Sequence, residues 1–173
     1  MKPLRQLLGN KKGSVAFAAT ICIVSLLGFT AFSVDAGYAY MSYNRLRAST
    51  EAAALAGAKD IGVGGTPIAT ANAYSAISGG KTAIAGVTAT MTSGYPALTC
   101  FSGAQSRGLA CSTNQTPGTS ANGILVQQSA VVPLFFASFI GVPSVTMSAN
   151  ATALKNKEIE VTIRNFIAAL PRP

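Results

Sequence analysis

The chain has 173 residues, which is enough for one membrane anchor and one compact domain but leaves little room for a second core. Only 10% of the residues are charged, against roughly 25% in soluble domains, and the abundance of Ala, Thr, Ser and Gly favours an exported protein over a cytosolic enzyme. The formal net charge is +8, but the basic residues form no stripe interleaved with aromatic residues, so we expect no nucleic-acid partner.

The first 34 residues have the pattern of a membrane anchor. Residues 1–12 form a basic leader, and residues 13–34 are a stretch of 22 residues without any charge. About 20 apolar residues are needed to cross a hydrocarbon core of about 30 Å, so we predict a transmembrane helix over residues 13–34. The leader contains four basic residues and no acidic one: Lys2, Arg5, Lys11 and Lys12.

The distribution of basic residues predicts the orientation of this anchor. The leader has four basic residues, against Arg45 and Arg47 on the far side of the anchor, which favours an N-terminus in the cytoplasm and an exported domain. A cleaved secretory signal peptide is the alternative interpretation. The uncharged stretch is longer than the 7–15 residues typical of such a signal, and Val34-Asp35-Ala36 is a poor cleavage site.

Residues 35–59 continue the helical pattern beyond the anchor. They contain no proline and are rich in good helix formers, so we expect a helical stalk. A continuous helix from Ser14 to Lys59 would be about 70 Å long at 1.5 Å per residue. One side of the stalk is a narrow face of mostly small residues, which either receives another helix in an assembly or packs on the chain's own domain. The face consists of Tyr43, Leu46, Ala53 and Gly57.

Residues 60–173 are expected to form one exported α+β domain. Pro67 begins a predicted short helix over residues 67–77. Alternating apolar and polar residues predict four strands of an antiparallel sheet with one wet face, over residues 87–92, 124–132, 145–153 and 158–164. A turn at residues 155–157 would join the last two strands as a hairpin. The predicted fold is therefore α+β, with a long N-terminal helix followed by a small antiparallel sheet with short helices.

The most apolar short segment outside the anchor is Pro133 to Ile140, with the sequence PLFFASFI. Pro133 can occupy the first position of a short helix, and Gly141 followed by Pro143 marks its end. The segment either covers the buried face of the sheet or docks on a partner or on the bilayer surface. Its possible docking residues are Leu134, Phe135, Phe136 and Phe139.

Two cysteines lie in the polar segment from Ser93 to Gly123, which is rich in Gly, Ser and Thr. Cys100 and Cys111 are too few for a metal site in a chain without histidine, so we predict a disulfide, which requires an oxidising compartment. The alternative is two unrelated free thiols. Cys22 lies in the uncharged stretch, where a thiol packs as a small hydrophobic group.

The residue types required for catalysis are scarce. There is no histidine, the commonest general base, and there are only five carboxylates. Glu158 and Glu160 share one face of a predicted strand, where two carboxylates are usually a solvated edge. We therefore expect no enzymatic activity, no cofactor, no metal and no small-molecule substrate.

Two blocks of the sequence resemble a known family. The stretch GSVAFAATICIVSLLGFTAFSVDAGYAYMSYNRLRASTEAAALAGA is similar to the N-terminal region of Tad/Flp pilus-assembly proteins of the TadE/TadG type. Its shared features are a Gly-Ser, a hydrophobic helix, an Asp-x-Gly followed by an aromatic residue, an arginine-containing turn and an Ala-Ala-Ala-Leu-Ala run. The later stretch VVPLFFASFIGVPSVTMSANATA resembles a TadG-like pattern.

The resemblance implies a minor pilin-like or accessory component of a tight-adherence pilus, with a pilin-like architecture and in contact with other assembly proteins or pilins. It also implies that the chain is held in the inner membrane with its domain, residues 60–173, in the periplasm. Members that are cut by prepilin peptidase carry a Glu five residues after the cleaved Gly, and counting from Gly13 this position is Ala18. The chain thus resembles the unprocessed TadG-like branch, although it is short for that branch, whose members often carry a larger adhesion-type domain. A membrane-anchored surface or adhesion module unrelated to pilus building is the alternative function.

Overall fold

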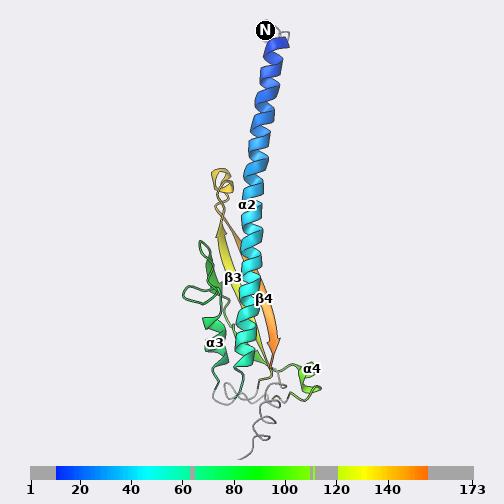
Figure 1. The fold of residues 1–173 in the computed structure, drawn as a ribbon, viewed down its shortest axis with the longest axis vertical. Helices are drawn as coiled ribbons and strands as arrows, with labels where there is room; N and C mark the ends of the chain where they lie inside the picture. Colours follow the sequence, from blue (N-terminus) through cyan, green and yellow to red (C-terminus); the bar gives the residue numbers. More distant parts are fainter. Residues whose placement is uncertain (1–10, 63–64, 110, 112–120, 156–173) are drawn as a thin grey trace, which may run out of the picture.

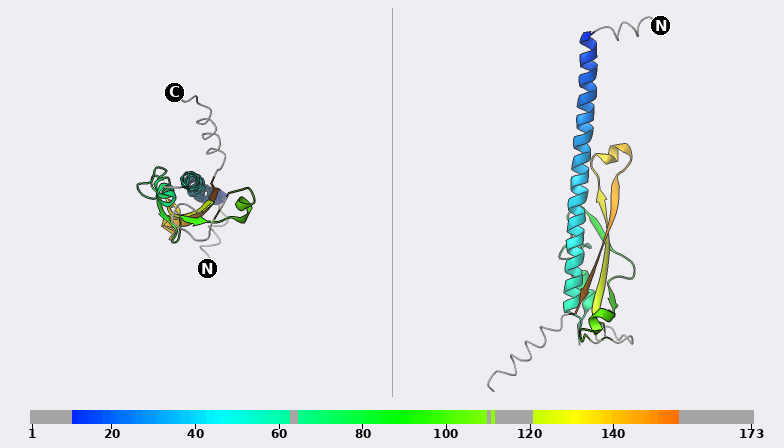
Figure 2. Two further views of the ribbon diagram at one scale, coloured as in Figure 1. Left: turned by 90° about the horizontal axis from the view of Figure 1, so that it is seen from below. Right: turned by 90° about the vertical axis from the view of Figure 1, so that its right-hand side faces the viewer.

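The computed structural model describes residues 11–62, 65–109, 111 and 121–155. Helix α2, Lys11–Lys59, is 49 residues long and runs without a break, as the sequence predicts. At 1.5 Å per residue this is about 74 Å. Its N-terminal half extends away from the rest of the chain, and its C-terminal half lies along a small domain (Figures 1 and 2). Two short helices, α3 (Pro67–Ala73) and α4 (Ser102–Gln105), belong to that domain.

The domain contains a four-stranded antiparallel sheet centred on β3, Gly123–Pro133. β4, Ser144–Leu154, pairs with β3 along its whole length. The other edge of β3 is shared by two short strands, β1 (Thr88–Met91) and β2 (Ala97–Thr99). A 3-10 helix, η1 (Ala137–Ile140), lies in the connection between β3 and β4. These elements confirm the predicted α+β fold class.

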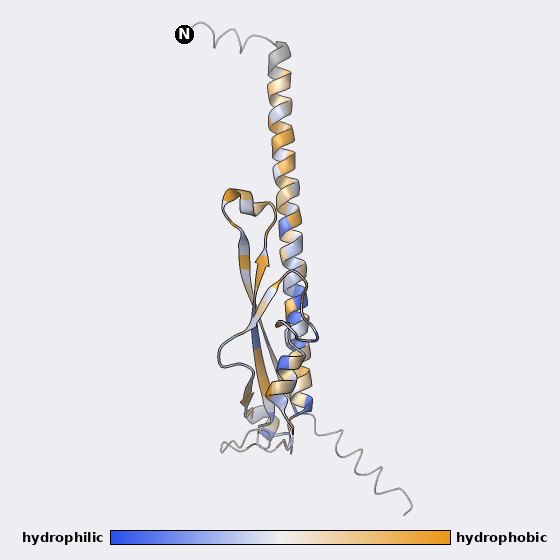
Figure 3. Cartoon of the chain, turned by 90° about the vertical axis from the view of Figure 1, so that its left-hand side faces the viewer, coloured by the Kyte–Doolittle hydropathy of each residue, from blue (hydrophilic) through white to orange (hydrophobic). Residues whose placement is uncertain are grey.

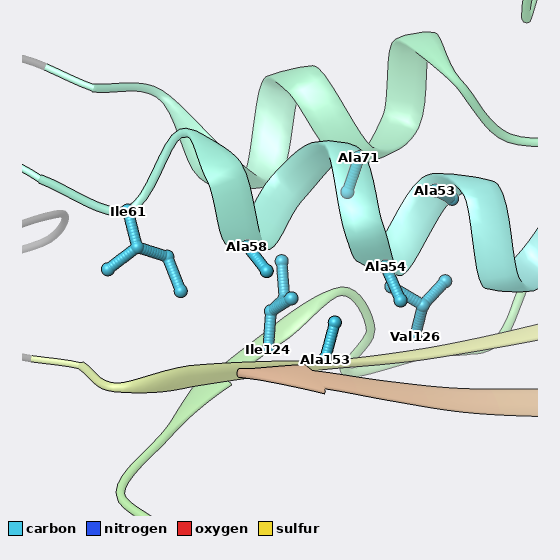
Figure 4. Close-up of a cluster of buried hydrophobic side chains, with 8 residues drawn as sticks. All are labelled: Ala53, Ala54, Ala58, Ile61, Ala71, Ile124, Val126 and Ala153. Atoms are coloured by element: carbon cyan, nitrogen blue, oxygen red, sulfur yellow. The ribbon is translucent and has the colours of Figure 1, made fainter. Parts of the chain in front are cut away.

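One face of the sheet packs against the C-terminal half of α2. Along β3 the predicted apolar face is buried, and the facing residues of β4 are smaller, so that Ile124 pairs with Ala153 and Val126 with Ala151. The small side chains on β4 and α2 allow the helix to lie close to the sheet. Figure 4 shows this core, which also includes α3 through Ala71. The buried hydrophobic cluster consists of Ala53, Ala54, Ala58, Ile61, Ala71, Ile124, Val126 and Ala153.

Three predicted elements differ from the structure. The helix predicted over 67–77 ends at Ala73, because the amide of Lys81 donates to the Ala73 carbonyl at 2.8 Å and the chain turns back. The segment 133–140 is not a helix from its start: Pro133 is the last residue of β3, and only Ala137–Ile140 is helical. β2 lies in a segment that the sequence pattern assigns to a loop.

The predicted strand over 158–164 and residues 156–157 of the predicted turn lie outside the described residues. Within the described residues, a hairpin joins β3 to β4 through residues 134–143, which we call the hairpin tip. The sheet extends along α2, so the hairpin tip lies beside the middle of the helix, at the end of the domain that faces the N-terminal half of α2 (Figures 1 and 2).

Candidate functional site

The N-terminal half of α2 exposes apolar side chains on all sides. By length and composition it can cross a membrane, and none of its most apolar 18-residue window is buried by the rest of the chain. Figure 3 shows this apolar segment continuing beyond the domain. Its large hydrophobic residues are 52–72% exposed: Val15, Phe17, Ile21, Ile23, Val24, Leu26, Leu27, Phe29, Phe32 and Val34. The chain is a membrane-anchored protein in which this segment is the anchor.

Over residues 15–34 the hydroxyl groups of the anchor are hydrogen-bonded within the helix. Thr20, Ser25 and Ser33 each donate to the backbone carbonyl four residues earlier, at 2.8–2.9 Å. Thr30 donates to the carbonyls of Leu26 and Leu27. A polar group without a partner is costly in hydrocarbon, where no water replaces the missing bond. The anchor is therefore compatible with lipid despite its moderate hydrophobicity.

The C-terminal half of α2 uses its small-residue face inside the domain. Leu46 and Ala53 are fully buried. A side chain at Gly57 would meet Ile124 Cδ1 at 2.8 Å and the Pro67 carbonyl at 2.9 Å, so only glycine allows this close approach to α3 and β3. Of the four residues predicted to form one assembly face, Tyr43 alone lies off the buried side, with 38% of its surface exposed.

A polar residue lies in the middle of this core. Gln128, the odd member of the β3 apolar face, is fully buried. Its Oε1 accepts from the amide of Ala76 at 2.8 Å, and its Nε2 donates to Thr50 Oγ1 at 3.2 Å. The Thr50 hydroxyl donates in turn to the Leu46 carbonyl at 2.7 Å. The amide side chain therefore connects the sheet to α2 and to the turn after α3, with its oxygen and nitrogen both bonded.

Asp35 binds the hairpin tip to α2. It is the first charged residue after the anchor and is 5% exposed. Its carboxylate accepts backbone N–H groups from Phe135 at 2.8 Å, Phe136 at 3.0 Å and Ala137 at 2.7 Å, which lie at the start of η1. One turn further along α2, the Tyr38 ring meets the Phe135 ring edge-on at 5.3 Å. These contacts join residues about 100 positions apart in the sequence.

An apolar cleft of about 470 Å³ lies between α2 and the hairpin tip. On the helix it extends from Gly28, inside the anchor, to Ala39, and Asp35 is the one charged residue in its wall. On the hairpin its wall contains Leu134, Phe136, Ala137 and Ile140, together with Val145 and Met147. Three of the four predicted docking residues are exposed: Phe135 at 56%, Phe136 at 46% and Phe139 at 88%. Leu134 is half-buried.

The structure contains the predicted disulfide between Cys100 and Cys111, whose Cα atoms are 5.8 Å apart. The pair lies at the end of the domain far from the anchor, next to α4 (Figure 1). Asn122 fixes the same region: its Oδ1 accepts from the amide of Phe101 at 2.7 Å, and its Nδ2 donates to the Phe101 carbonyl at 3.0 Å. Cys22 is exposed in the anchor.

Two acidic groups near the domain end of α2, Glu51 and Asp60, have partners close by in the chain. Arg47 Nε donates to Glu51 Oε1 at 2.9 Å, which raises the pKa of Arg47. Asp60 Oδ2 accepts from Thr70 Oγ1 at 2.7 Å and from the amide of Thr66 at 2.8 Å, and these bonds lower the pKa of Asp60. Asp60 thereby joins the end of α2 to the start of α3. In the described part of the chain, no three His, Cys, Asp or Glu residues form a group suited to a metal ion.

The sequence pattern missed two residues that organise the domain, Asp35 and Gln128. In the sequence, Asp35 marks only the end of the uncharged stretch. In the structure its carboxylate accepts hydrogen bonds from the backbone of the hairpin tip. A signal for Gln128 was present, since it interrupts an apolar face of otherwise regular period, but nothing local identifies Ala76 and Thr50 as its partners. Glu158 and Glu160 lie outside the described residues.

Comparison with known proteins gives one family. Residues 13–60 match the family described as "Putative Flp pilus-assembly TadE/G-like". No curated protein and no solved structure matches the chain. The matched residues coincide almost entirely with α2, so the shared feature is the anchor together with the helix on which the domain folds. Over residues 13–60 this match confirms the resemblance to the TadE/TadG type that the sequence indicates.

Proposed function

We propose that this protein is a structural component of a Tad (Flp) pilus-assembly or secretion system, held in the inner membrane and acting through contacts of its helix and domain. The observation that carries the proposal is the coincidence of the family-matched residues 13–60 with the single unbroken helix α2. What is shared with the family is the sequence of the helix that in this chain is both the membrane anchor and the spine of the domain, that is, the helix on which the sheet packs. No catalytic role is proposed, and the absence of histidine from the chain supports this.

The proposed orientation places the N-terminus in the cytoplasm and the domain in the periplasm. The excess of basic residues before the anchor supports it. The Cys100–Cys111 disulfide supports it independently, because disulfides persist in oxidising compartments. Non-reducing mass spectrometry of protein from the native host tests this point: an oxidised pair is expected, and free thiols on both cysteines would contradict export.

The small-residue face of the stalk packs mainly on the chain's own domain, which is one of the two alternatives that the sequence leaves open. Leu46, Ala53 and Gly57 are covered by the chain's own sheet and α3. The opposite side of α2 is open, with Tyr40 exposed by 70% and Leu55 by 66%. We infer that other assembly proteins or pilins contact this open side of the stalk.

Gene deletion with complementation tests the role. We expect the deletion strain to lose surface pili, wild-type protein to restore them, and Leu26→Arg/Leu27→Arg, which disrupts the anchor, to fail. Pili are counted by electron microscopy, and adherence is measured in the same strains. Normal pili with reduced adherence would favour the surface or adhesion module instead, and normal pili with normal adherence would refute a role in assembly.

A photo-cross-linking residue at position 55 tests the contact surface. We expect cross-links from position 55 to another assembly protein or pilin, since Leu55 points away from the domain. Position 46 is the matched control, because Leu46 is on the same helix but fully buried. Equal intermolecular cross-linking from both positions would contradict the assignment of the open side.

A further inference from the structure

We propose that the hairpin tip, residues 134–143, is a second membrane contact: its apolar side chains enter the leaflet nearest the domain, and lipid acyl chains occupy the cleft between the tip and α2. The inference rests on the anchor and does not depend on a role in pilus assembly. The occupant is the bilayer that α2 itself spans.

The position of the tip along α2 supports this assignment. Asp35, which holds the tip, is the residue at which the uncharged stretch ends. The cleft reaches Gly28, seven residues further toward the N-terminus, which is about 10 Å along a helix of 1.5 Å rise per residue. A bilayer that covers the exposed residues 15–34 therefore also meets the upper part of the tip and the mouth of the cleft.

The chemistry of the tip also fits a membrane interface. Phe139 and Ile140 are 88% and 81% exposed, and no charged residue occurs anywhere from Ile124 to Ala153. Lower down the same hairpin, the exposed residues of β4 include Thr146, Ser148 and Asn150. Large exposed apolar groups are thus concentrated at the end nearest the anchor (Figure 3). Patches of this kind mark contact with another apolar phase.

Backbone N–H groups of the hairpin tip have hydrogen-bond partners within the chain, which suits a medium with little water. The N–H groups of Phe135, Phe136 and Ala137 bond to the Asp35 carboxylate. The tip also bonds across itself, from Leu134 N to the Pro143 carbonyl at 2.9 Å and from Val142 N to the Ala137 carbonyl at 3.0 Å. Irregular backbone enters apolar surroundings only when its polar groups have partners.

Two tyrosines lie on α2 close to the level of the hairpin tip, where a membrane interface is proposed. Tyr38 contacts Phe135, and Tyr40 projects from α2 with 70% of its surface exposed. Tyrosines gather at the boundary between hydrocarbon and water, where the ring is in the apolar phase and the hydroxyl remains wet. They lie just beyond Asp35 on the domain side, as expected if the hydrocarbon boundary crosses the molecule at the tip.

Tryptophan fluorescence in vesicles tests the proposal, because the natural chain contains no tryptophan. The full-length variants Phe139→Trp, Phe32→Trp and Tyr74→Trp would each be reconstituted alone into phosphatidylcholine and phosphatidylglycerol vesicles. Phe32 is 72% exposed in the anchor, and Tyr74 is 37% exposed on the domain after α3. These two positions are the membrane and water controls.

We expect Phe139→Trp to have a blue-shifted emission and to be quenched by lipids with brominated acyl chains, as Phe32→Trp is. Acrylamide in the water should quench Tyr74→Trp strongly and Phe139→Trp weakly. A Phe139→Trp signal that follows Tyr74→Trp would overturn the proposal and leave the tip as a surface for a protein partner. Because the vesicles contain no other protein, a positive result assigns the contact to lipid whatever the pilus phenotype shows.

A second variant tests the role of Asp35 in holding the tip at this depth. In Asp35→Asn combined with Phe139→Trp, quenching by brominated lipid should fall and quenching by acrylamide should rise, because asparagine has one accepting oxygen and no charge where aspartate has two oxygens that bond to the tip. Ser33→Ala combined with Phe139→Trp is the control, since Ser33 bonds only within the helix. Equal quenching in both double variants would contradict the positioning role of Asp35.

Discussion

The two halves of α2 have the same backbone geometry but face different surroundings. The N-terminal half has large apolar side chains on every side, and the rest of the chain leaves them exposed. The C-terminal half buries one narrow face, in which alanine, serine and glycine alternate with few large residues. A helix that is apolar all round belongs in lipid, and a helix with one apolar stripe belongs on a protein core. One element therefore acts as anchor and as spine.

The largest effect is expected when charge is introduced into the N-terminal half of α2, and the same change in the C-terminal half should be tolerated. Leu26→Arg/Leu27→Arg places two charges in the anchor, which costs on the order of 6–8 kcal/mol of insertion free energy at the helix centre. We expect the variant to be lost from the membrane fraction after carbonate extraction. Leu55→Arg on the exposed side of the spine is the control and should remain in the membrane. Equal retention of both variants in the membrane fraction would contradict the division of α2 into a membrane half and a domain half.

The next effect tests the packing of the spine. Leu46→Ala removes a fully buried side chain and should lower the free energy of unfolding by about 2–5 kcal/mol. Leu55→Ala removes the same atoms from a position that is 66% exposed, and such surface changes are usually within about 0.5 kcal/mol. Thermal unfolding in detergent micelles, followed by circular dichroism, measures both. A similar Tm for the two variants would refute the buried face.

A smaller effect concerns the buried amide between spine and sheet. Gln128→Met keeps the shape but leaves the Ala76 N–H without its acceptor, at a cost of about 1–3 kcal/mol. Gln127→Met, on the opposite face of β3, should change the stability little. The same unfolding measurement applies. An unchanged Tm for Gln128→Met would show that the hydrogen bond to Ala76 contributes nothing.

The smallest effect depends on pH and concerns the end of the spine. Hydrogen bonds from Thr70 and Thr66 lower the pKa of Asp60, so their contribution is present above the ordinary aspartate pKa of about 3.9 and is lost as the pH falls toward the lowered value. Thr70→Val should therefore lower the Tm slightly at pH 7, and the difference from wild type should shrink in acid. In an Asp60→Asn background the difference should no longer depend on pH, and a pH-dependent difference there would exclude Asp60 as its source.

The parts of the fold that the sequence predicts are those with long, regular patterns. The uncharged stretch and the helix formers after it predict α2, and the period-2 alternation predicts the buried faces of β3 and β4. β2 has only three residues, too few for a pattern to be recognised. The helix from Pro67 ends early because of a bond from Lys81, which no property of residues 74–77 reveals.

The candidate site was predicted in composition but not in geometry. The apolar character of Phe135, Phe136 and Phe139 indicates either a cover for the buried face of the sheet or a segment that docks on a partner or on the bilayer surface. Its location beside the end of the anchor depends on the register of β3 with β4 and on the contact with Asp35. Both are long-range features, since they join residues far apart in the chain.

The parallel course of α2 and the β3–β4 hairpin has a mechanical consequence. The hairpin is fixed to the helix at Asp35 near one end and through the core around Ala53 and Ile124 near the other. A force along the axis of the anchor therefore loads the contacts between α2 and the hairpin in shear. These contacts share the load and do not break one after another. With two attachment points the domain also cannot swivel about the rod, so any neighbour in the membrane meets it at one fixed angle.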